Sequence, residues 1–367
     1  MSFLTLERVA KTYPDGTPAV HHVDLTVHEG EFIVLLGPSG CGKTTTLRMV
    51  AGLELATGGV IRLAGEDVTA KRPSERDVGF VFQFYALYPH LTVRDNLAFP
   101  LQASGVSRPE RATRIAEVAV AVGITALLDE YPRQLSGGDQ QRVSLARAMI
   151  RRPRLWLMDE PLGTLDADQR QQLGSFIKAQ QQRHRVTTLF VTHDQEEAMH
   201  LADRIVVMEA GRVVQVGTPE DVYQHPATRF AAHFVGSPGM NLIRGVLSEG
   251  FFRSGDLVVP VPVPVPLAVP LVTDSASSRS VRDGAVELGI RPEYLSFVAP
   301  GTPDACPGTV LFDEFLGDIR LVHVQVGEVR LVVRAPAKQR YAPGSPVQVA
   351  CAPSGIRLFD VQSGARW

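Results

Sequence analysis

Runs of apolar residues alternate with helix-like patterns along the first part of the chain. Three short runs consist almost only of apolar side chains, as in strands buried on both faces of a sheet: Phe32–Leu36, Leu155–Met158 and Thr188–Val191. Between these runs, Arg108–Val122 has apolar residues at helical spacing, and Asp166–Arg183 is a polar segment with an acidic N-cap. Strands that alternate with helices predict an α/β layer with a parallel sheet.

The pattern changes in the C-terminal part of the chain. Arg320–Val326 and Glu328–Arg334 alternate polar and apolar residues around Gly327, which predicts a β-hairpin. Of the 26 prolines, 14 lie in the shorter stretch 237–367. Short strands separated by glycine and proline predict a small barrel or sandwich. We therefore expect an α/β domain over residues 1–236 and an all-β domain over residues 237–367.

The segment Leu257–Thr273 has no charged residue and is close to the length of a membrane span. A proline inside a helix costs about 3 kcal/mol, so we expect an extended edge or loop here and no transmembrane helix. The prolines are Pro260, Pro262, Pro264, Pro266 and Pro270. The N-terminus also lacks the pattern of a signal peptide. We expect a soluble, cytoplasmic chain, so that any membrane span belongs to other subunits.

Composition and charge restrict the class of protein further. Apolar residues make up 44% and charged residues 21% of the chain, as in ordinary soluble globular proteins. The net charge of −2 offers no basic field for nucleic acid. The three cysteines form no C-x-x-C pair, which predicts a reducing compartment and no cysteine zinc site.

The predicted strand Phe32–Leu36 runs into a glycine-rich segment that matches the G-x-x-x-x-G-K-[ST] pattern. In such a turn, backbone N–H groups and the following helix N-terminus bind phosphate oxygens. Lys43 would reach the β- and γ-phosphates of ATP, and the Thr44 hydroxyl would bind Mg²⁺. The predicted phosphate-binding residues are Gly37, Pro38, Ser39, Gly40, Cys41, Gly42, Lys43, Thr44 and Thr45.

Two carboxylates follow the run Leu155–Met158, at the strand end where open α/β sheets bind ligands. Asp159 is suited to the Mg²⁺ shell, and Glu160 is suited to polarising the attacking water. Ser136–Gly138 precedes a helix and, taken alone, indicates a helix N-cap at Ser136 without a ligand. Together with the phosphate loop, it predicts a second anion-binding helix N-terminus. One nucleotide needs one phosphate cradle, so the second cradle predicts two copies that face each other and close each other's ATP sites.

With its motifs in this order, nearly the whole chain resembles the ATP-binding cassette (ABC) family of transporter ATPases. The family fold is an α/β P-loop NTPase cassette, a RecA-like core plus a helical subdomain that would cover about residues 84–152. The matching motifs are the Walker A loop Gly37–Thr45, the Q-loop residue Gln83, the signature motif Leu135–Gln140, the Walker B acids Asp159 and Glu160, the D-loop Pro161–Asp166, the switch residue His193 and the adenine-stacking Tyr13.

The resemblance implies that the chain hydrolyses ATP with Mg²⁺. Lys43 and the loop amides would hold the phosphates, while Thr44, Gln83 and Asp159 would organise Mg²⁺. Tyr13 would stack on the adenine ring.

The resemblance also implies how catalysis is shared between two copies. Glu160 would activate the attacking water, and His193 would contact the γ-phosphate. Hydrolysis would then break contacts that hold the dimer shut. The residues contributed in trans would be Ser136, Gly137, Gly138, Gln140 and Asp166.

Two places depart from the family pattern. Asp139 stands where importers of this kind usually have glutamine, and an acid near the γ-phosphate would weaken closure on ATP if its side chain points inward. Gly163 and Thr164 replace the usual D-loop residues, and Gly163 adds backbone freedom at the subunit contact. Neither change removes a catalytic group, so we expect activity.

The C-terminal part resembles the TOBE/OB-like regulatory domain of sugar-importer ATPases, as in maltose or sn-glycerol-3-phosphate uptake. The matching segments are Gly236–Asn241, Gly289–Glu293 and Arg357–Asp360. In that family the tail is a pair of oligonucleotide-binding-like β-barrels that mediates dimer contacts and binds regulators, and the fold name implies no nucleic acid. Tyr85–Val93 fits the same branch, where it lies beside the groove that receives the permease.

The resemblance implies a peripheral protein at the cytoplasmic face of the inner membrane. Its partners would be a second copy or a close paralogue, two transmembrane permease subunits, an extracytoplasmic solute-binding protein reached through the permease, and a regulator at the tail. Import of a carbohydrate is the leading hypothesis, and import of a polyamine, ferric iron or an oxyanion stays open. A non-transport ABC protein or a small-molecule kinase fits less well, because the chain has one cassette, no coiled-coil insertion and a signature motif.

Overall fold

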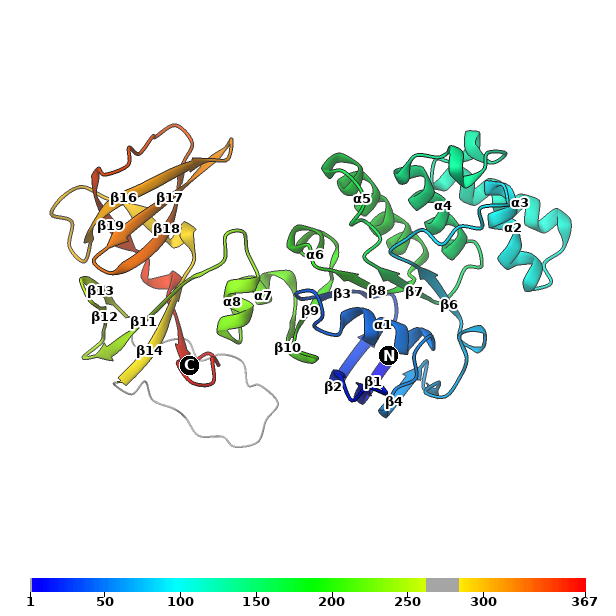
Figure 1. The fold of residues 1–367 in the computed structure, drawn as a ribbon, viewed down its shortest axis with the longest axis horizontal. Coiled ribbons are helices and arrows are strands. Elements are labelled where there is room, and N and C mark those ends of the chain that lie inside the picture. The colour runs from blue at the N-terminus through cyan, green and yellow to red at the C-terminus, as the bar shows by residue number, and fades with distance from the viewer. Residues whose placement is uncertain (1, 262–283) are drawn as a thin grey trace. The chain divides into compact units, whose positions relative to one another are not determined.

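Packing divides the chain into two units, Met1–Pro219 and Glu220–Trp367, in the computed structural model shown in Figure 1. The structure describes residues 2–261 and 284–367. Within these ranges, no helix has the length and apolar character that a membrane span requires. Each unit has its own apolar core.

The first unit is built on a six-stranded sheet. Five strands run parallel, and β10 pairs antiparallel with β9 at one edge. The three predicted buried strands are confirmed as β3, β8 and β7, in which every residue is buried. The strand order is β10 (Arg212–Gly217), β9 (Arg204–Glu209), β3 (Phe32–Leu36), β8 (Thr187–Thr192), β7 (Leu155–Asp159) and β6 (Val78–Val81).

Helix α1 (Lys43–Ala51) packs between the parallel sheet and a smaller antiparallel sheet. Apolar side chains from both sheets and from α1 form one core. Helices α5 (Ala167–His184) and α6 (Gln195–Leu201) lie on the opposite face of the parallel sheet (Figure 1). The strand order in the smaller sheet is β2 (Pro18–His28), β1 (Ser2–Thr12), β4 (Gly58–Leu63) and β5 (Glu66–Asp67).

Helices dominate the chain between β6 and β7. The helix predicted over Arg108–Val122 is confirmed as α3 (Arg108–Ala121), which packs with α2 (Val93–Ala103) and α4 (Gly137–Met149). Leu97, Leu101 and Ile115 form part of the apolar interior of this group. In Figure 1, α2 and α3 lie beyond β6, and α4 lies between them and α5. The group falls within the range expected for the helical subdomain.

The second unit contains two five-stranded antiparallel sheets that share one apolar core. The predicted hairpin is confirmed as β17 and β18, which pair without interruption and turn at Gly327 with a φ of 54°. One sheet has the order β13 (Leu257–Pro260), β12 (Phe251–Ser254), β11 (Asn241–Ser248), β14 (Gly284–Ile290) and β20 (Arg357–Asp360). The other has the order β15 (Leu295–Phe297), β19 (Pro346–Cys351), β16 (Cys306–Phe315), β17 (Ile319–Val326) and β18 (Val329–Pro336).

The uncharged segment Leu257–Thr273 begins as an edge strand. β13 pairs with β12 at the end of its sheet, and its inward-facing Leu257 and Val259 are buried. This start agrees with the predicted extended edge. The rest of the prediction, from residue 262 onward, lies outside the described residues.

Residues 220–236 pack with the second unit, so packing divides the chain at Pro219/Glu220, while the domain boundary at residue 236 stays a prediction. The segment contains most of α7 (Pro219–Gln224) and all of α8 (Arg229–Phe234). The guanidinium of Arg291, which is 1% exposed, donates to the carbonyls of Tyr223 and Val235, each at 2.7 Å. These buried bonds tie the segment to the β-rich unit because a buried guanidinium requires acceptors.

The packing predicts that the first unit is stable without the second. A fragment of residues 1–219 should fold as a monomer. Its Kd for nucleotide should be within about twofold of that of the full chain, a difference in binding free energy below about 0.5 kcal/mol. A fragment of residues 1–236 should also bind nucleotide but aggregate, because Val222, Ala231 and Val235 lose the unit that buries them. Size-exclusion chromatography and nucleotide titration measure both properties. An aggregated 1–219 fragment beside a soluble 1–236 fragment would contradict the boundary.

Candidate functional site

The predicted phosphate loop connects β3 to α1 as a tight glycine-rich turn. Gly40 and Gly42 have φ values of 77° and 98°, in the left-handed region that glycine tolerates best. A Cβ atom at Gly42 would lie 2.6 Å from the carbonyl oxygen of Ala19, so no larger residue fits there without movement. The turn delivers the chain into α1 at Lys43, which leaves the first helical N–H groups free for an anion.

Lys43 is held inside this loop. Its side chain is buried, and Nζ donates to the carbonyl oxygens of Gly37 at 2.7 Å and Pro38 at 2.9 Å. Two neutral carbonyls do not neutralise an ammonium group, so the loop retains a positive charge next to its free N–H groups. This arrangement suits a multiply charged phosphate ligand.

Thr44 and Asp159, the two residues predicted to hold the cation, lie side by side. Thr44 Oγ1 donates to Asp159 Oδ1 at 2.7 Å. Burial raises the pKa of Asp159, while the hydrogen bond from Thr44 and the charges of Arg48 and Lys43 act in the opposite direction. A buried carboxylate next to a hydroxyl offers the hard oxygen ligands that a divalent cation such as Mg²⁺ prefers.

One carboxylate oxygen of Glu160 contacts the side chains of both Gln83 and His193. Gln83 Nε2 donates to Glu160 Oε2 at 3.2 Å, and His193 Nδ1 lies 3.3 Å from the same oxygen. Glu160 follows β7 directly and has a φ of 46°, a left-handed conformation that is rare outside glycine and common at functional sites. The three side chains come from three separate loops, which the sheet brings to one edge.

Tyr13 lies beside the start of α1. Its hydroxyl is 3.4 Å from Thr45 Oγ1, and the ammonium group of Lys11 lies 5.1 Å from the ring centroid. The Tyr13 hydroxyl therefore lies next to the end of the phosphate loop.

The second predicted anion-binding helix N-terminus is that of α4, which Ser136 caps. Ser136 Oγ accepts from the backbone N–H of Asp139 at 3.2 Å and donates to Asp139 Oδ2 at 2.6 Å. The carboxylate of Asp139 therefore faces the Ser136 hydroxyl at the mouth of the helix. Gln140 Nε2 donates to the carbonyl of Leu135 at 3.3 Å.

The glycines of this helix start leave little spare room. A Cβ atom at Gly137 would lie 3.1 Å from the Tyr85 hydroxyl, and one at Gly138 would lie 2.9 Å from Gln169 Oε1. Asp166 stands nearby as the N-cap of α5, where its Oδ1 accepts from the N–H of Gln169 at 2.9 Å. Among the residues that the structure describes, no hydrogen bond joins the N-terminus of α4 to the phosphate loop.

Two contacts at the site have no clear signal in the sequence. Tyr85 Oη lies 3.0 Å from Thr164 Oγ1, which joins the segment after Gln83 to the D-loop position that departs from the family pattern. Arg170 pairs with Asp194 and Glu197 across α5 and α6. An arginine in a polar helix is usually exposed to solvent, so the sequence gives little reason to single out Arg170. The one available signal is that it lies four residues after the Asp166 cap.

Family models match both parts of the chain. The ABC transporter model matches residues 20–163, the MalK OB fold domain model matches residues 236–295, and the TOBE domain model matches residues 288–359. These matches confirm the predicted order of an ATP-binding cassette followed by an OB/TOBE domain.

The chain is similar over its full length to ATP-binding proteins of importers. It is 44% identical to an sn-glycerol-3-phosphate import ATP-binding protein, UgpC 1, of Rhizobium johnstonii, over 99% of this chain and 96% of the relative. It is 42% identical to the sulfoquinovosyl glycerol transport ATP-binding protein SmoE of Agrobacterium fabrum, over 98% of both chains. It is 40% identical to the trehalose import ATP-binding protein SugC of Mycobacterium tuberculosis, over 100% of this chain and 98% of the relative.

Solved structures match the first unit. One is a dimeric ATP-binding cassette in a post-hydrolysis state bound to ADP and Pi, which is 31% identical with a TM-score of 0.54 and covers 59% of this chain and 98% of its own. Another is CbiO1 of Clostridium perfringens, part of an ABC transporter complex, which is 25% identical with a TM-score of 0.57 and covers 60% of this chain and 91% of its own.

The position of Cys41 predicts slow, pH-dependent alkylation that nucleotide blocks. Cys41 is 3% exposed, and burial raises the pKa of its thiol above the ordinary value of 9.0. Only the thiolate reacts, so the alkylation rate should rise about tenfold per pH unit up to that pKa. Saturating ATP should suppress the reaction because the nucleotide covers the loop.

Mass spectrometry of iodoacetamide-treated protein measures alkylation at each cysteine separately. Cys351 is the internal control, because burial raises the pKa of its thiol to about 12 and it lies in the second unit. Its slow labelling should not respond to ATP. Equal labelling of Cys41 with and without saturating ATP would show that the loop does not bind nucleotide in the predicted way.

Proposed function

The chain belongs to the family of ABC transporter ATP-binding proteins, and from that premise we propose that it is the ATP-hydrolysing subunit of a carbohydrate importer. The family assignment rests on full-length similarity to importer ATP-binding proteins. The observation that carries the chemistry is the convergence of Gln83, Glu160 and His193 on one carboxylate oxygen, beside the Thr44–Asp159 pair. The relatives named for sugar or glycerol-derivative import support a carbohydrate as the solute.

Binding of ATP would use the positive cradle. Lys43 and the free N–H groups at the start of α1 would hold the phosphates, and Tyr13 would stack on the base. Thr44, Asp159 and Gln83 would hold Mg²⁺, which neutralises phosphate charge when bound. Binding of a cation would also favour the ionised form of Asp159, whose pKa burial raises.

Hydrolysis would use the carboxylate cluster. Glu160 would accept a hydrogen bond from the attacking water and orient it toward the γ-phosphorus, and the bond from that phosphorus to the bridging oxygen of ADP would break. His193, whose Nδ1 lies 3.3 Å from the Glu160 carboxylate, would contact the γ-phosphate. The left-handed backbone of Glu160 holds its carboxylate at this edge of the sheet before substrate arrives.

A complete site would need a second copy of the chain or a close paralogue. The α4 start would present Ser136, Gly137, Gly138 and Gln140 to the γ-phosphate bound by the other copy, and Asp166 would lie at the contact between the two. The dimeric cassette bound to ADP and Pi, which is similar to the first unit, supports this arrangement. Loss of the γ-phosphate would then release the contacts that hold the dimer closed.

The helical group carries an exposed apolar surface suited to the permease. The side chains of Phe84, Tyr88 and Phe99 are 75%, 36% and 46% exposed, and the Tyr88 and Phe99 rings lie 4.9 Å apart. We propose that two transmembrane permease subunits cover this surface and hold the chain at the cytoplasmic face of the inner membrane. The permease would connect it to an extracytoplasmic solute-binding protein, and the second unit would bind a regulator.

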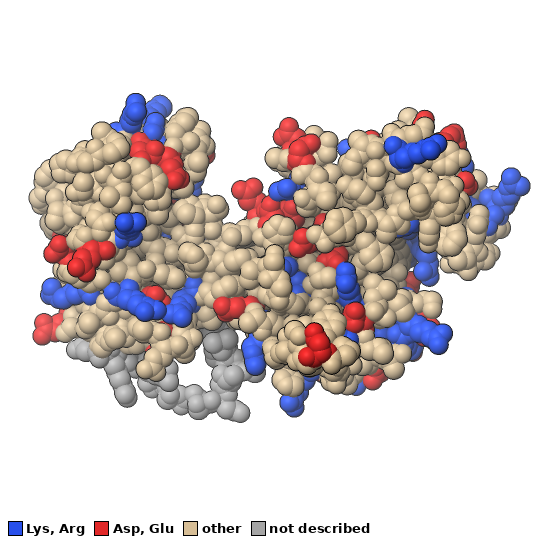
Figure 2. Space-filling view, viewed as in Figure 1, with Lys and Arg blue, Asp and Glu red and all other residues tan. Residues whose placement is uncertain are grey.

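The charge distribution suits protein partners better than a polyanion. On the face drawn in Figure 2, basic and acidic side chains are interspersed over each unit. This agrees with the net charge of −2 and with protein partners in place of nucleic acid.

Replacing Glu160 by glutamine tests the catalytic assignment. Glu160→Gln keeps the size and the hydrogen-bonding oxygen but removes the carboxylate, so the ATPase rate should fall about 100-fold or more. ATP binding should persist, and the variant should accumulate as an ATP-bound dimer. A phosphate-release assay and light scattering measure the two effects. Rapid turnover by this variant would exclude Glu160 as the group that activates water.

Replacing Asp139 by asparagine tests the charge at the signature motif. Asp139→Asn keeps an oxygen acceptor for Ser136 but removes a negative charge close to the incoming γ-phosphate. In a Glu160→Gln background, the ATP concentration for half-maximal dimerisation should fall roughly fivefold, which corresponds to about 1 kcal/mol. Salt screens the charge, so this fall should be smaller at high salt.

The matched control is Asp129→Asn, because Asp129 is an exposed carboxylate that pairs with Arg94 on the helical group. This control should leave the ATP requirement unchanged. An Asp139→Asn variant that needs as much ATP as its parent would show that the carboxylate does not oppose closure.

A further inference from the structure

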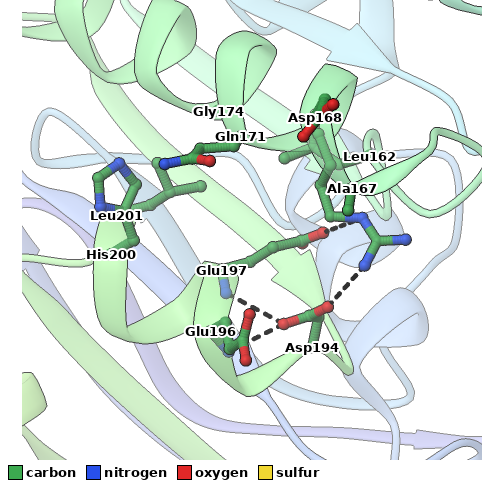
Figure 3. Close-up of a pocket in the computed structure, with 11 residues that line it drawn as sticks. Leu162, Ala167, Asp168, Gln171, Gly174, Asp194, Glu196, Glu197, His200 and Leu201 are labelled. Atoms are coloured by element: carbon green, nitrogen blue, oxygen red, sulfur yellow. Dashed lines mark hydrogen bonds and ion pairs between the residues drawn. The ribbon is translucent and has the colours of Figure 1, made fainter. Parts of the chain in front are cut away.

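Arg170 occupies the first turn of α5, four residues after the Asp166 cap. Its side chain lines a cavity of about 360 Å³ whose walls are formed by residues of α5 and α6. Figure 3 shows Asp194 and Glu197 at this cavity. The backbone N–H of Arg170 donates to the carbonyl of Asp166 at 2.9 Å. The residue is thus attached to the end of the D-loop by its main chain, and its guanidinium is available to other elements.

The guanidinium makes three contacts with three different parts of the chain. Nη1 donates to Asp194 Oδ2 at 2.9 Å, Nε lies 3.5 Å from Glu197 Oε1, and Nη2 donates to the carbonyl of Leu165 at 3.2 Å. Leu165 belongs to the D-loop, Asp194 follows His193 directly, and Glu197 lies in α6. A planar, forked cation can make such contacts at once, whereas a single ammonium cannot.

The two carboxylates are bonded on either side of the loop that carries His193: Asp194 caps N–H groups of α6, and Glu197 contacts the hydroxyl of Thr192. Glu197 is 8% exposed, and its other oxygen accepts from Thr192 Oγ1 at 2.7 Å. The same Thr192 oxygen accepts from the N–H of Asp194 at 2.9 Å. His193 itself is 57% exposed at the side chain, so its position depends on these flanking bonds more than on packing.

The network is more than an exposed ion pair. Exposed pairs contribute about 0–1 kcal/mol, and many have no measurable effect. Glu197, however, is buried, and burial raises the pKa of its carboxyl group, as does the charge of Asp194. The hydrogen bond from Thr192 and the charges of Arg170 and His193 lower that pKa. Loss of Arg170 would leave the Glu197 carboxylate without the guanidinium that balances its charge, so the segment around His193 would rearrange.

We infer that Arg170 is a positioning residue that couples the D-loop to His193. The D-loop ends at Asp166, and the proposed function places Asp166 at the contact with the second copy and His193 at the γ-phosphate, so this inference rests on that proposal. Closure of the dimer would fix Leu165 and Asp166, and Arg170 would transmit that position to Thr192 and Asp194. Arg170 would thus act through its contacts with Leu165, Asp194 and Glu197.

The test compares Arg170→Met with Arg170→Lys in the full chain. The Met variant removes every polar contact at similar length, so kcat for ATP hydrolysis should fall about 10- to 100-fold, as a displacement of about 1 Å at a reacting group does. The apparent KM for ATP should stay within about twofold, because the phosphate cradle is intact. The Lys variant should recover part of kcat, since it keeps the charge but reaches one carboxylate at a time.

A double-mutant cycle with His193→Ala separates positioning from general destabilisation. If Arg170 acts through His193, Arg170→Met should lower the residual rate of His193→Ala less than about twofold in a single-turnover assay. An equal fractional loss in both backgrounds would overturn the inference. If the Met variant does not fold, as thermal unfolding would show, the Lys variant enters the same cycle.

The matched control is Arg152→Met, which breaks an exposed ion pair with Glu117 at 2.9 Å. It should leave kcat unchanged in both backgrounds. A wild-type chain without ATPase activity would refute the proposed function, whereas an active wild type with an equally active Arg170→Met variant would refute the coupling alone.

Discussion

The parallel pairing of β3, β8 and β7 is the constraint on which the site depends. Parallel strands end at the same edge of a sheet, so the segments that follow them must meet. Here these segments carry Lys43 and Thr44 after β3, Glu160 after β7, and His193 after β8. The pairing itself is held by strands buried on both faces, which makes the apolar core of the first unit the physical basis of its chemistry.

The site keeps charged groups partly desolvated and close to oppositely charged or polar ones. Lys43 lies against two carbonyls, Asp159 against a hydroxyl, and Glu197 against a hydroxyl and a guanidinium. Each such group is stable only while its partners remain in place, because burial without them is costly. A ligand or a second subunit that supplies or removes one charge can therefore shift several side chains together.

Much of the fold and most of the site follow from the sequence because their patterns are local. The buried strands lie where continuous apolar runs predict them, α3 and the β17–β18 hairpin where hydrophobic periodicity does, and α5 where its acidic N-cap does. The packing of residues 220–236 with the second unit is not evident from the sequence, because the contacts of Arg291 with Tyr223 and Val235 join residues distant in sequence. The hydrophobic pattern of α7 and α8 does not indicate which unit buries these helices.

The sequence is enough to identify the candidate residues: a glycine-rich turn, a lysine, a hydroxyl, two acids and a histidine at family spacing. Their meeting depends on the fold, because the packing of distant strands brings Gln83 and His193 to the same carboxylate oxygen of Glu160. The tertiary structure also decides that Asp139 faces Ser136 and that Arg170 spans α5 and α6. Side-chain direction depends on the partners that surround a residue, and those partners come from elsewhere in the chain.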